Sequence, residues 1–187
     1  MEKNVKLNSI KIAQMAMLTA ISVVSLYTIP LWSIFPAASF LQYDVADVPV
    51  LLGTMLFGPG AGLMILLVVS VIQGLTISAQ SGWVGIVMHF CASGALVLVS
   101  GLINKKWNNW RGLVAGLALG ALSMTAVMIP LNLIFTVHFL GAPLQVVKDM
   151  LVPFIIPFNL IKGGLNAAIS AALIYPIKNI LKKLRLI

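Results

Sequence analysis

The chain has 187 residues, of which 60% are hydrophobic and 9% are charged, and its formal net charge at pH 7 is +8. A soluble globular domain carries about 25% charged residues, so this composition excludes a soluble protein and indicates an integral membrane protein. The positive charge does not indicate a nucleic-acid interface, because the sequence has no basic groove pattern with interleaved aromatic residues. A single cysteine excludes an intrachain disulfide and a cysteine metal cluster.

We expect an all-α membrane protein with six transmembrane helices in one bundle, a single domain over residues 1–187. The helices are predicted at about residues 10–29, 47–57, 63–77, 83–103, 112–135 and 151–177. Several of these segments are near or below the ~20 residues that a perpendicular helix needs to cross the hydrocarbon core. The first apolar run, Ile12 to Trp32, is longer than the ~7–15-residue core of a signal peptide, so we interpret it as a retained helix.

The first predicted helix carries three small residues, Ala13, Ala16 and Ala20. Ala16 and Ala20 form a small-xxx-small pair, which lets a second backbone approach closely. On these residues alone, packing within the same bundle is the simpler interpretation. The following residues, 30–45, mix aromatic and polar side chains and are predicted to form a loop, either an interfacial aromatic belt or a lid over a site.

Turn signals divide the rest of the chain. Asp47 is predicted to cap the second helix, with Pro49 in its first turn. The segment Gly58–Gly62, with the sequence GPGAG, is predicted to end that helix in a sharp turn. Further loops are expected at residues 78–82, 105–111 and 136–150.

The basic residues orient the bundle. With both termini in the cytoplasm, ten of the twelve basic residues lie on the inner side. These are Lys3, Lys6, Lys11, Lys105, Lys106, Arg111, Lys178, Lys182, Lys183 and Arg185. The positive-inside rule therefore predicts cytoplasmic termini, and Asp44, Asp47 and Asp149 then fall on the outer side.

Lys162 lies well inside the last predicted helix, three residues after Asn159, so the two side chains share a helix face. A lysine well inside a membrane helix costs roughly 3 kcal/mol or more and normally faces a cavity or a partner. Snorkelling to the interface is the alternative, and it is disfavoured because the segment continues to Ile174. In the predicted topology Asn132, from the fifth helix, reaches the same depth.

Polar groups from four helices and the 30–45 loop are thus predicted to meet near the outer face. Asparagine offers a donor and an acceptor and lysine only donors, which suits a ligand with ring carbonyls and imide N–H groups. Aromatic side chains would add a flat apolar wall. An amide that only bridges two helices is the alternative for Asn132 taken alone. The predicted ligand-binding residues are Tyr43, Asp44, Trp83, His89, Asn132, Phe158, Asn159 and Lys162.

One pair of residues, His89 and Ser93, offers a catalytic alternative. His89 and Ser93 are four residues apart on one helix face, as in an intramembrane serine hydrolase, but one helix turn does not establish a productive dyad. We therefore predict no catalytic residues. The chain has only two histidines, so we also predict no metal site. The P-loop pattern is absent, so ATP-driven transport would need hydrolysis by another subunit.

Two stretches carry a family resemblance: Tyr43–Pro49 followed by Phe57–Gly62, and Ile156–Gly163. They resemble the substrate-binding S-components of energy-coupling factor (ECF) vitamin transporters, most closely the riboflavin-specific branch. The resemblance implies a multi-pass subunit of a bacterial plasma membrane that captures riboflavin outside the cell and has no cofactor. The positions matching Asn132, Asn159 and Lys162 would hold the edge of the flavin ring.

The resemblance also implies partners. The bundle would dock through Ala13, Ala16 and Ala20 onto a membrane T subunit driven by two ABC ATPases, and tip over to release the vitamin inside. His89 stands where we expect an amide in this branch, and the loop from Ser78 to Trp83 is richer in polar residues. Another flavin such as riboflavin phosphate (FMN), or another vitamin, therefore stays open as the ligand.

Overall fold

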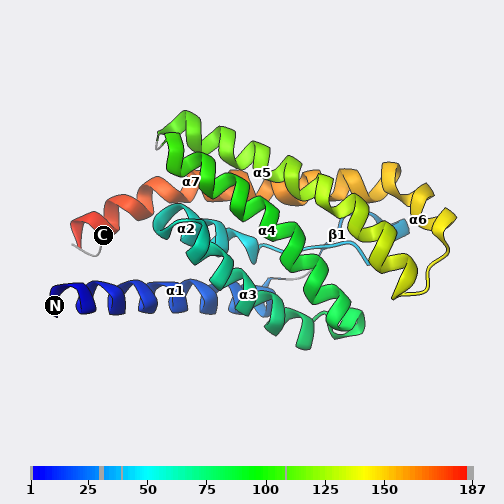
Figure 1. Ribbon diagram of the computed structural model, residues 1–187, viewed down its shortest axis with the longest axis horizontal. Helices are drawn as coiled ribbons and strands as arrows, with labels where there is room; N and C mark the ends of the chain where they lie inside the picture. Colours follow the sequence, from blue (N-terminus) through cyan, green and yellow to red (C-terminus); the bar gives the residue numbers. More distant parts are fainter. Residues whose placement is uncertain (1, 30–31, 39, 108, 185–187) are drawn as a thin grey trace.

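Helices make up nearly all of the computed structural model, which describes residues 2–29, 32–38, 40–107 and 109–184. The long helices run in one bundle (Figure 1). The N-terminal end of α1 (Glu2–Thr28) and the C-terminal end of α7 (Ile156–Lys183) lie at the same end of that bundle, and β1 and α6 lie toward the other (Figure 1). The expected all-α membrane fold is confirmed.

The remaining elements alternate long helices with short connecting turns. In chain order after α1 they are β1 (Trp32–Ser33), the 3₁₀ turn η1 (Pro36–Ala38), β2 (Gln42–Tyr43), α2 (Asp47–Phe57), α3 (Pro59–Leu75), the 3₁₀ turn η2 (Ala79–Ser81), α4 (Gly82–Trp107), α5 (Trp110–Leu131), the π-helical turn η3 (Asn132–Thr136), α6 (Leu144–Met150) and the π-helical turn η4 (Leu151–Ile155), which leads into α7. The strands pair antiparallel, with Trp32 opposite Tyr43.

Four helical segments of the described residues are long and apolar enough to cross a membrane. They are Ser9–Thr28, Ala79–Trp107, Trp110–Thr136 and Leu144–Lys183. The other two helices, α2 and α3, have 11 and 17 residues. At 1.5 Å per residue α2 rises only about 16 Å, roughly half the hydrocarbon thickness of a bilayer.

The short helix α2 forms the centre of the bundle. It packs against α1, α3, α4 and α7, and its residues from Asp47 to Met55 are all buried. A helix surrounded on all sides needs apolar residues all round, which explains why its sequence has no polar stripe. The Ser22 hydroxyl of α1 donates to the Ala46 carbonyl (2.8 Å) and fixes the start of α2 against α1.

Several predicted boundaries were wrong. The GPGAG segment is not a turn of five residues, because α3 begins at Pro59 and only Gly58, at φ 95°, breaks the chain direction. Proline at the first helical position costs no hydrogen bond, so the helix starts immediately. Lys105–Trp107 continue α4, and the predicted loop at 136–150 contains α6 and the end of η3.

Close packing of α4 on α5 depends on glycine. A Cβ built on Gly120 would lie 2.9 Å from the carbonyl oxygen of Leu96, a backbone atom that cannot rotate away. By contrast, Gly164 on the exposed side of α7 has nothing within 4 Å of the same position. Contact between the two backbones is therefore possible only without a side chain at position 120.

We expect Gly120→Leu to lower the melting temperature of the detergent-purified protein, because overpacking of this kind costs about 1–3 kcal/mol or more. The matched variant Gly164→Leu should leave the melting temperature unchanged or raise it, since leucine has the higher helix propensity. Differential scanning fluorimetry of both variants measures this. Equal melting temperatures would contradict the packing described for α4 and α5.

Candidate functional site

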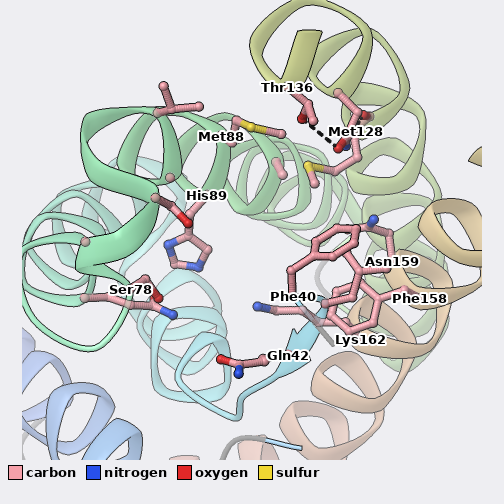
Figure 2. Close-up of a pocket in the computed structure, with 18 of the residues that line it drawn as sticks. Phe40, Gln42, Ser78, Met88, His89, Met128, Thr136, Phe158, Asn159 and Lys162 are labelled. Atoms are coloured by element: carbon pink, nitrogen blue, oxygen red, sulfur yellow. Dashed lines mark hydrogen bonds between the residues drawn. The ribbon is translucent and has the colours of Figure 1, made fainter. Parts of the chain in front are cut away.

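A cavity of about 240 Å³ opens between α3, α4, α5 with η3, and α7, and the β2 segment borders it (Figure 2). Six of the predicted ligand-binding residues line it: Asp44, His89, Asn132, Phe158, Asn159 and Lys162. The expected convergence of polar groups from several helices and the loop is therefore present.

Lys162 forms a buried ion pair with Asp44. The Nζ atom lies 2.8 Å from Asp44 Oδ2, and the two side chains are 8% and 4% exposed. The ammonium therefore does not reach toward lipid head groups, and the snorkelling alternative is wrong. Asp44, which we predicted as a ligand-binding residue on the outer side, is the counter-ion that makes a buried lysine tolerable.

Asp44 holds a network that connects the loop to α3 and α7. Its Oδ1 accepts from the Ala46 amide at the start of α2 (3.2 Å), and its Oδ2 is 3.4 Å from Gln73 Nε2. Asn166 Nδ2 donates to the Asp44 carbonyl (3.2 Å). Both carboxylate oxygens of Asp44 thus accept hydrogen bonds from the protein, which fixes the orientation of the loop.

Tyr43 supports this network from outside the cavity. Its hydroxyl donates to Asn166 Oδ1 (2.9 Å), and Tyr43 is not among the residues that line the cavity. Burial and the neighbouring Asp44 carboxylate raise the pKa of Tyr43, so the phenol keeps the proton that it donates. The position of Tyr43 indicates a structural role rather than a contact with a ligand in the cavity.

Asn132 and Asn159 face the cavity with their carboxamides tied to their own helices. Each Nδ2 donates to the backbone carbonyl four residues earlier, Met128 for the first and Ile155 for the second, both at 2.8 Å. Thr136 donates to Asn132 Oδ1 (3.2 Å). Because one donor hydrogen of each amide is used in this way, the amide planes are fixed while polar capacity remains for a ligand.

Methionine and phenylalanine side chains contribute to the apolar part of the cavity wall. Met88 of α4, Met124 and Met128 of α5, and Phe158 of α7 line it. Phe40 borders the cavity from the loop and is 60% exposed (Figure 2). Methionine adapts its shape to a flat ligand, and phenylalanine presents a rigid face, so this wall suits an aromatic ring system.

Trp83 lies away from the cavity. It is 55% exposed and packs edge-on against Phe135 and Phe139, with ring centroids 6.1 and 5.0 Å away. The prediction that it lines the ligand site is therefore not supported by its position. This aromatic group joins the start of α4 to η3 and the turn that follows it, as is typical of side chains near a membrane interface.

His89 joins a second buried network behind the cavity. Its Nδ1 lies 2.9 Å from Ser70 Oγ, and its Nε2 lies 3.4 Å from Asp47 Oδ1. Asp47 does not cap α2 as expected; its Oδ2 accepts from the Ser93 hydroxyl (2.9 Å). Ser93 is thus hydrogen-bonded to Asp47 rather than to His89 and is almost fully buried, so the geometry does not form a serine–histidine dyad.

Several residues that line the cavity were not among the predicted ligand-binding residues. Ser70 and Gln73 both line the cavity, and Phe40 covers part of it. Within the described ranges, no group of three or more histidine, cysteine or acidic residues has the arrangement of a metal site.

Comparison with known proteins gives a consistent result. A family model for the substrate-specific component of ECF transporters matches residues 10–174. The riboflavin transporter RibU of Streptococcus thermophilus is 33% identical over 187 residues, covering 95% of this chain and 87% of that protein. The riboflavin transporter FmnP of Bacillus subtilis is 32% identical over 163 residues, covering 82% of this chain and 84% of that protein.

A solved structure supports the same relationship at the level of the fold. It is described as the S component of a bacterial ECF transporter, and it superposes on this chain with a TM-score of 0.76 at 32% sequence identity. The superposition covers 92% of this chain and 97% of that structure. The arrangement of helices around the cavity is therefore shared with a transport subunit.

Proposed function

The chain belongs to the family of substrate-specific components of ECF transporters, and from this premise we propose that it is the subunit that captures riboflavin at a bacterial cell membrane. Members of this family are transport subunits, so the hydrolase alternative falls away. Relatives named as riboflavin transporters match most of the chain. The ligand would be transported cargo, and no cofactor is expected.

The observation that carries the proposal is the set of polar groups around one apolar wall. Lys162, Asn132 and Asn159 face the cavity together with Phe158. The flavin ring has a polar edge with two carbonyls and one imide N–H between them. The free amide hydrogen of Asn132 and the ammonium of Lys162 match the carbonyls, and Asn159 Oδ1 matches the imide N–H.

The charges around the cavity favour the uncharged vitamin over FMN. Lys162 is already paired with Asp44, and His89 is beside Asp47. In the residues described, these are the only basic side chains that line the cavity. A phosphate dianion would therefore share the cavity with the Asp44 carboxylate, without an unpaired cation to compensate it.

We place both termini in the cytoplasm and count six spans, with α2 and α3 as the short ones. The support is the charge distribution, together with the N-terminal end of α1 and the C-terminal end of α7 at one end of the bundle (Figure 1). The cavity residues Asn132 and Asn159 then lie toward the outer face. A test is accessibility of single introduced cysteines to a membrane-impermeant thiol reagent, in a Cys91→Ala background.

Docking onto a T subunit with two ATPase subunits is proposed for the exposed face of α1. Ala13, Ala16 and Ala20 lie on this face and are exposed, whereas Leu18 and Leu26 on the opposite side are buried. The interpretation of the Ala16–Ala20 pair as packing within the bundle is therefore wrong. Small residues left uncovered in a membrane helix suit close approach of another helix.

We expect the purified protein to quench riboflavin fluorescence with saturable, one-to-one binding, and Asn159→Leu to weaken binding at least tenfold. The reason is that an unpaired imide N–H in a buried site costs about 1–3 kcal/mol. The control Asn179→Leu changes the same residue type on the exposed side of α7. Absence of quenching by the unmodified protein would refute riboflavin as the ligand.

A further inference from the structure

Five basic side chains gather where the turn between α4 and α5 meets the C-terminal part of α7. Lys105 and Lys106 are in the last turn of α4, and Arg111 is the second residue of α5. Lys178 and Lys182 are four residues apart on one face of α7. Figure 1 shows the α4–α5 turn and the C-terminal end of α7 at the same end of the bundle. We call these five residues the basic corner.

A contact between two aromatic rings joins the two parts of the basic corner. The Trp110 ring, next to Arg111, packs against the Tyr175 ring of α7, with centroids 5.6 Å apart and an interplanar angle of 51°. Tyr175 is three residues before Lys178, so these two side chains lie on the same face of α7. The start of α5 is therefore fixed beside the basic face of α7.

No carboxylate of the chain is placed to neutralise the basic corner. The chain has four acidic residues, and none belongs to α4, α5 or α7. Within the described residues, both contacts between basic and acidic side chains are at the cavity, Lys162 with Asp44 and His89 with Asp47. Lys178 is partly buried, and the other four cations of the corner are exposed. Like charges that share one surface repel each other, so the corner favours an anion from outside the chain.

The basic corner continues directly into an apolar surface. Leu102 is 55% exposed and precedes Lys105 and Lys106 by three and four residues. Val114 is 43% exposed and follows Arg111 by three residues. Each of these apolar side chains therefore lies on the same helix face as a cation, on the side toward the middle of the membrane. Charge followed by apolar surface matches a phospholipid, which has a headgroup followed by acyl chains.

We propose that the basic corner binds the headgroup of an anionic phospholipid, with the acyl chains along the adjoining apolar surface of α4 and α5. Basic pockets between membrane helices on the cytoplasmic side are suited to such headgroups. Trp107 and Trp110, at 53% and 52% exposed, flank the α4–α5 turn, as is typical of tryptophan at the bilayer interface. An acidic protein would meet the cations without using the apolar surface, so a lipid fits this site better.

The lipid site is separate from the ligand cavity and from the proposed docking face. None of the five cations lines the cavity, and α1 lies on the opposite side of the bundle from α5 (Figure 1). The proposal does not depend on riboflavin as the transported ligand. Only the assignment of the lipid to the cytoplasmic leaflet follows from the proposed topology.

The test is native mass spectrometry of the detergent-purified protein, titrated with phosphatidylglycerol or with phosphatidylcholine that carries the same acyl chains. We expect phosphatidylglycerol to bind at least tenfold more tightly. Arg111→Gln combined with Lys178→Gln should weaken phosphatidylglycerol binding at least tenfold, because each basic residue near an anionic headgroup contributes about fivefold. Binding of phosphatidylcholine should change less than twofold.

A matched control removes the same number of positive charges elsewhere. Lys11→Gln combined with Lys148→Gln changes two exposed lysines outside the basic corner and should alter phosphatidylglycerol binding less than twofold. The melting temperature of each double variant verifies that it is folded. If the variant at positions 111 and 178 does not fold, Lys105→Gln combined with Lys106→Gln makes the same comparison, with the same loss expected.

Three outcomes would overturn the proposal. Equal loss in the corner variant and in the control would show that net charge alone attracts the lipid. Equal affinity for the two lipids, or no bound lipid, would leave an acidic protein surface as the partner of the corner. Displacement of phosphatidylglycerol by 10 mM inorganic phosphate, roughly the ionic strength at which the Debye length is still 30 Å, would assign the corner to a free phosphate ion. Flavin binding has no part in these measurements, so the result is independent of the proposed function.

Discussion

Lys162→Met is expected to cost about 3–5 kcal/mol of stability and to raise the dissociation constant for riboflavin more than a hundredfold. The substitution keeps the length and the apolar stem of the side chain but leaves Asp44 charged, buried and without its partner at 2.8 Å. Breaking a buried ion pair by removing one charge has a cost of this size. Thermal unfolding and fluorescence titration of the detergent-purified protein measure the two effects.

A double variant shows which part of the loss comes from the stranded carboxylate. Asp44→Asn combined with Lys162→Met leaves no unpaired charge, so we expect it to regain most of the stability lost in the single variant. Riboflavin binding should stay weak, because the ammonium is also proposed to contact the flavin. The control Lys148→Met removes an exposed lysine on α6 and should change neither measurement.

Two results would contradict the roles assigned to Lys162. If Lys162→Met melts at the temperature of the unmodified protein, Asp44 does not depend on the ammonium for its stability. If the double variant binds riboflavin as tightly as the unmodified protein, Lys162 serves the fold alone and the proposed contact with the flavin is wrong.

The importance of Lys162 could be predicted from the sequence, but its partner could not. A lysine three residues from an asparagine inside a long apolar segment already implies a cavity, because lipid does not accept the charge. Asp44 is 118 positions away, in a segment that was predicted to be a loop outside the membrane. Long-range packing decides which loop folds back between the helices, so this contact cannot be predicted from a local sequence pattern.

Trp83 and Tyr43 show a second limit of sequence reasoning. Both are aromatic residues near the predicted outer face, and either a cavity wall or an interfacial position fits that description. Periodicity gives the depth of a residue in the membrane but not the direction in which a flanking side chain points. In the structure Trp83 packs against Phe139, and Tyr43 donates to Asn166.

The helix ends differ from the prediction for a related reason. The GPGAG segment was interpreted as a break, yet Pro59 starts α3. Pro130 and Pro153, which lie inside the predicted helices 112–135 and 151–177, are found within α5 and within the π-helical turn η4. In a membrane bundle, π-helical turns and neighbouring helices accommodate the missing amide hydrogen bonds. Asn132 and Asn159, which are proposed to contact the ligand, lie at or just after these turns.

Ala16→Trp is expected to abolish riboflavin uptake by the assembled transporter while leaving riboflavin binding by the isolated subunit within twofold of normal. Ala16 is exposed on the face of α1 opposite the buried Leu18 and Leu26, and it does not line the cavity. A large ring at this position keeps a second helix from approaching the α1 backbone. Uptake of labelled riboflavin by cells that also express the T and ATPase subunits measures the effect.

A tryptophan elsewhere on the lipid-facing surface separates docking from a general effect on membrane insertion. Leu122→Trp, on α5, introduces the same side chain at a residue that is 54% exposed and is expected to leave both uptake and binding intact. Full uptake by Ala16→Trp would show that the partner subunits contact another face of the bundle. Loss of binding in this variant would show instead that α1 and the cavity are coupled, because α1 holds the start of α2 through the Ser22 hydrogen bond to the Ala46 carbonyl.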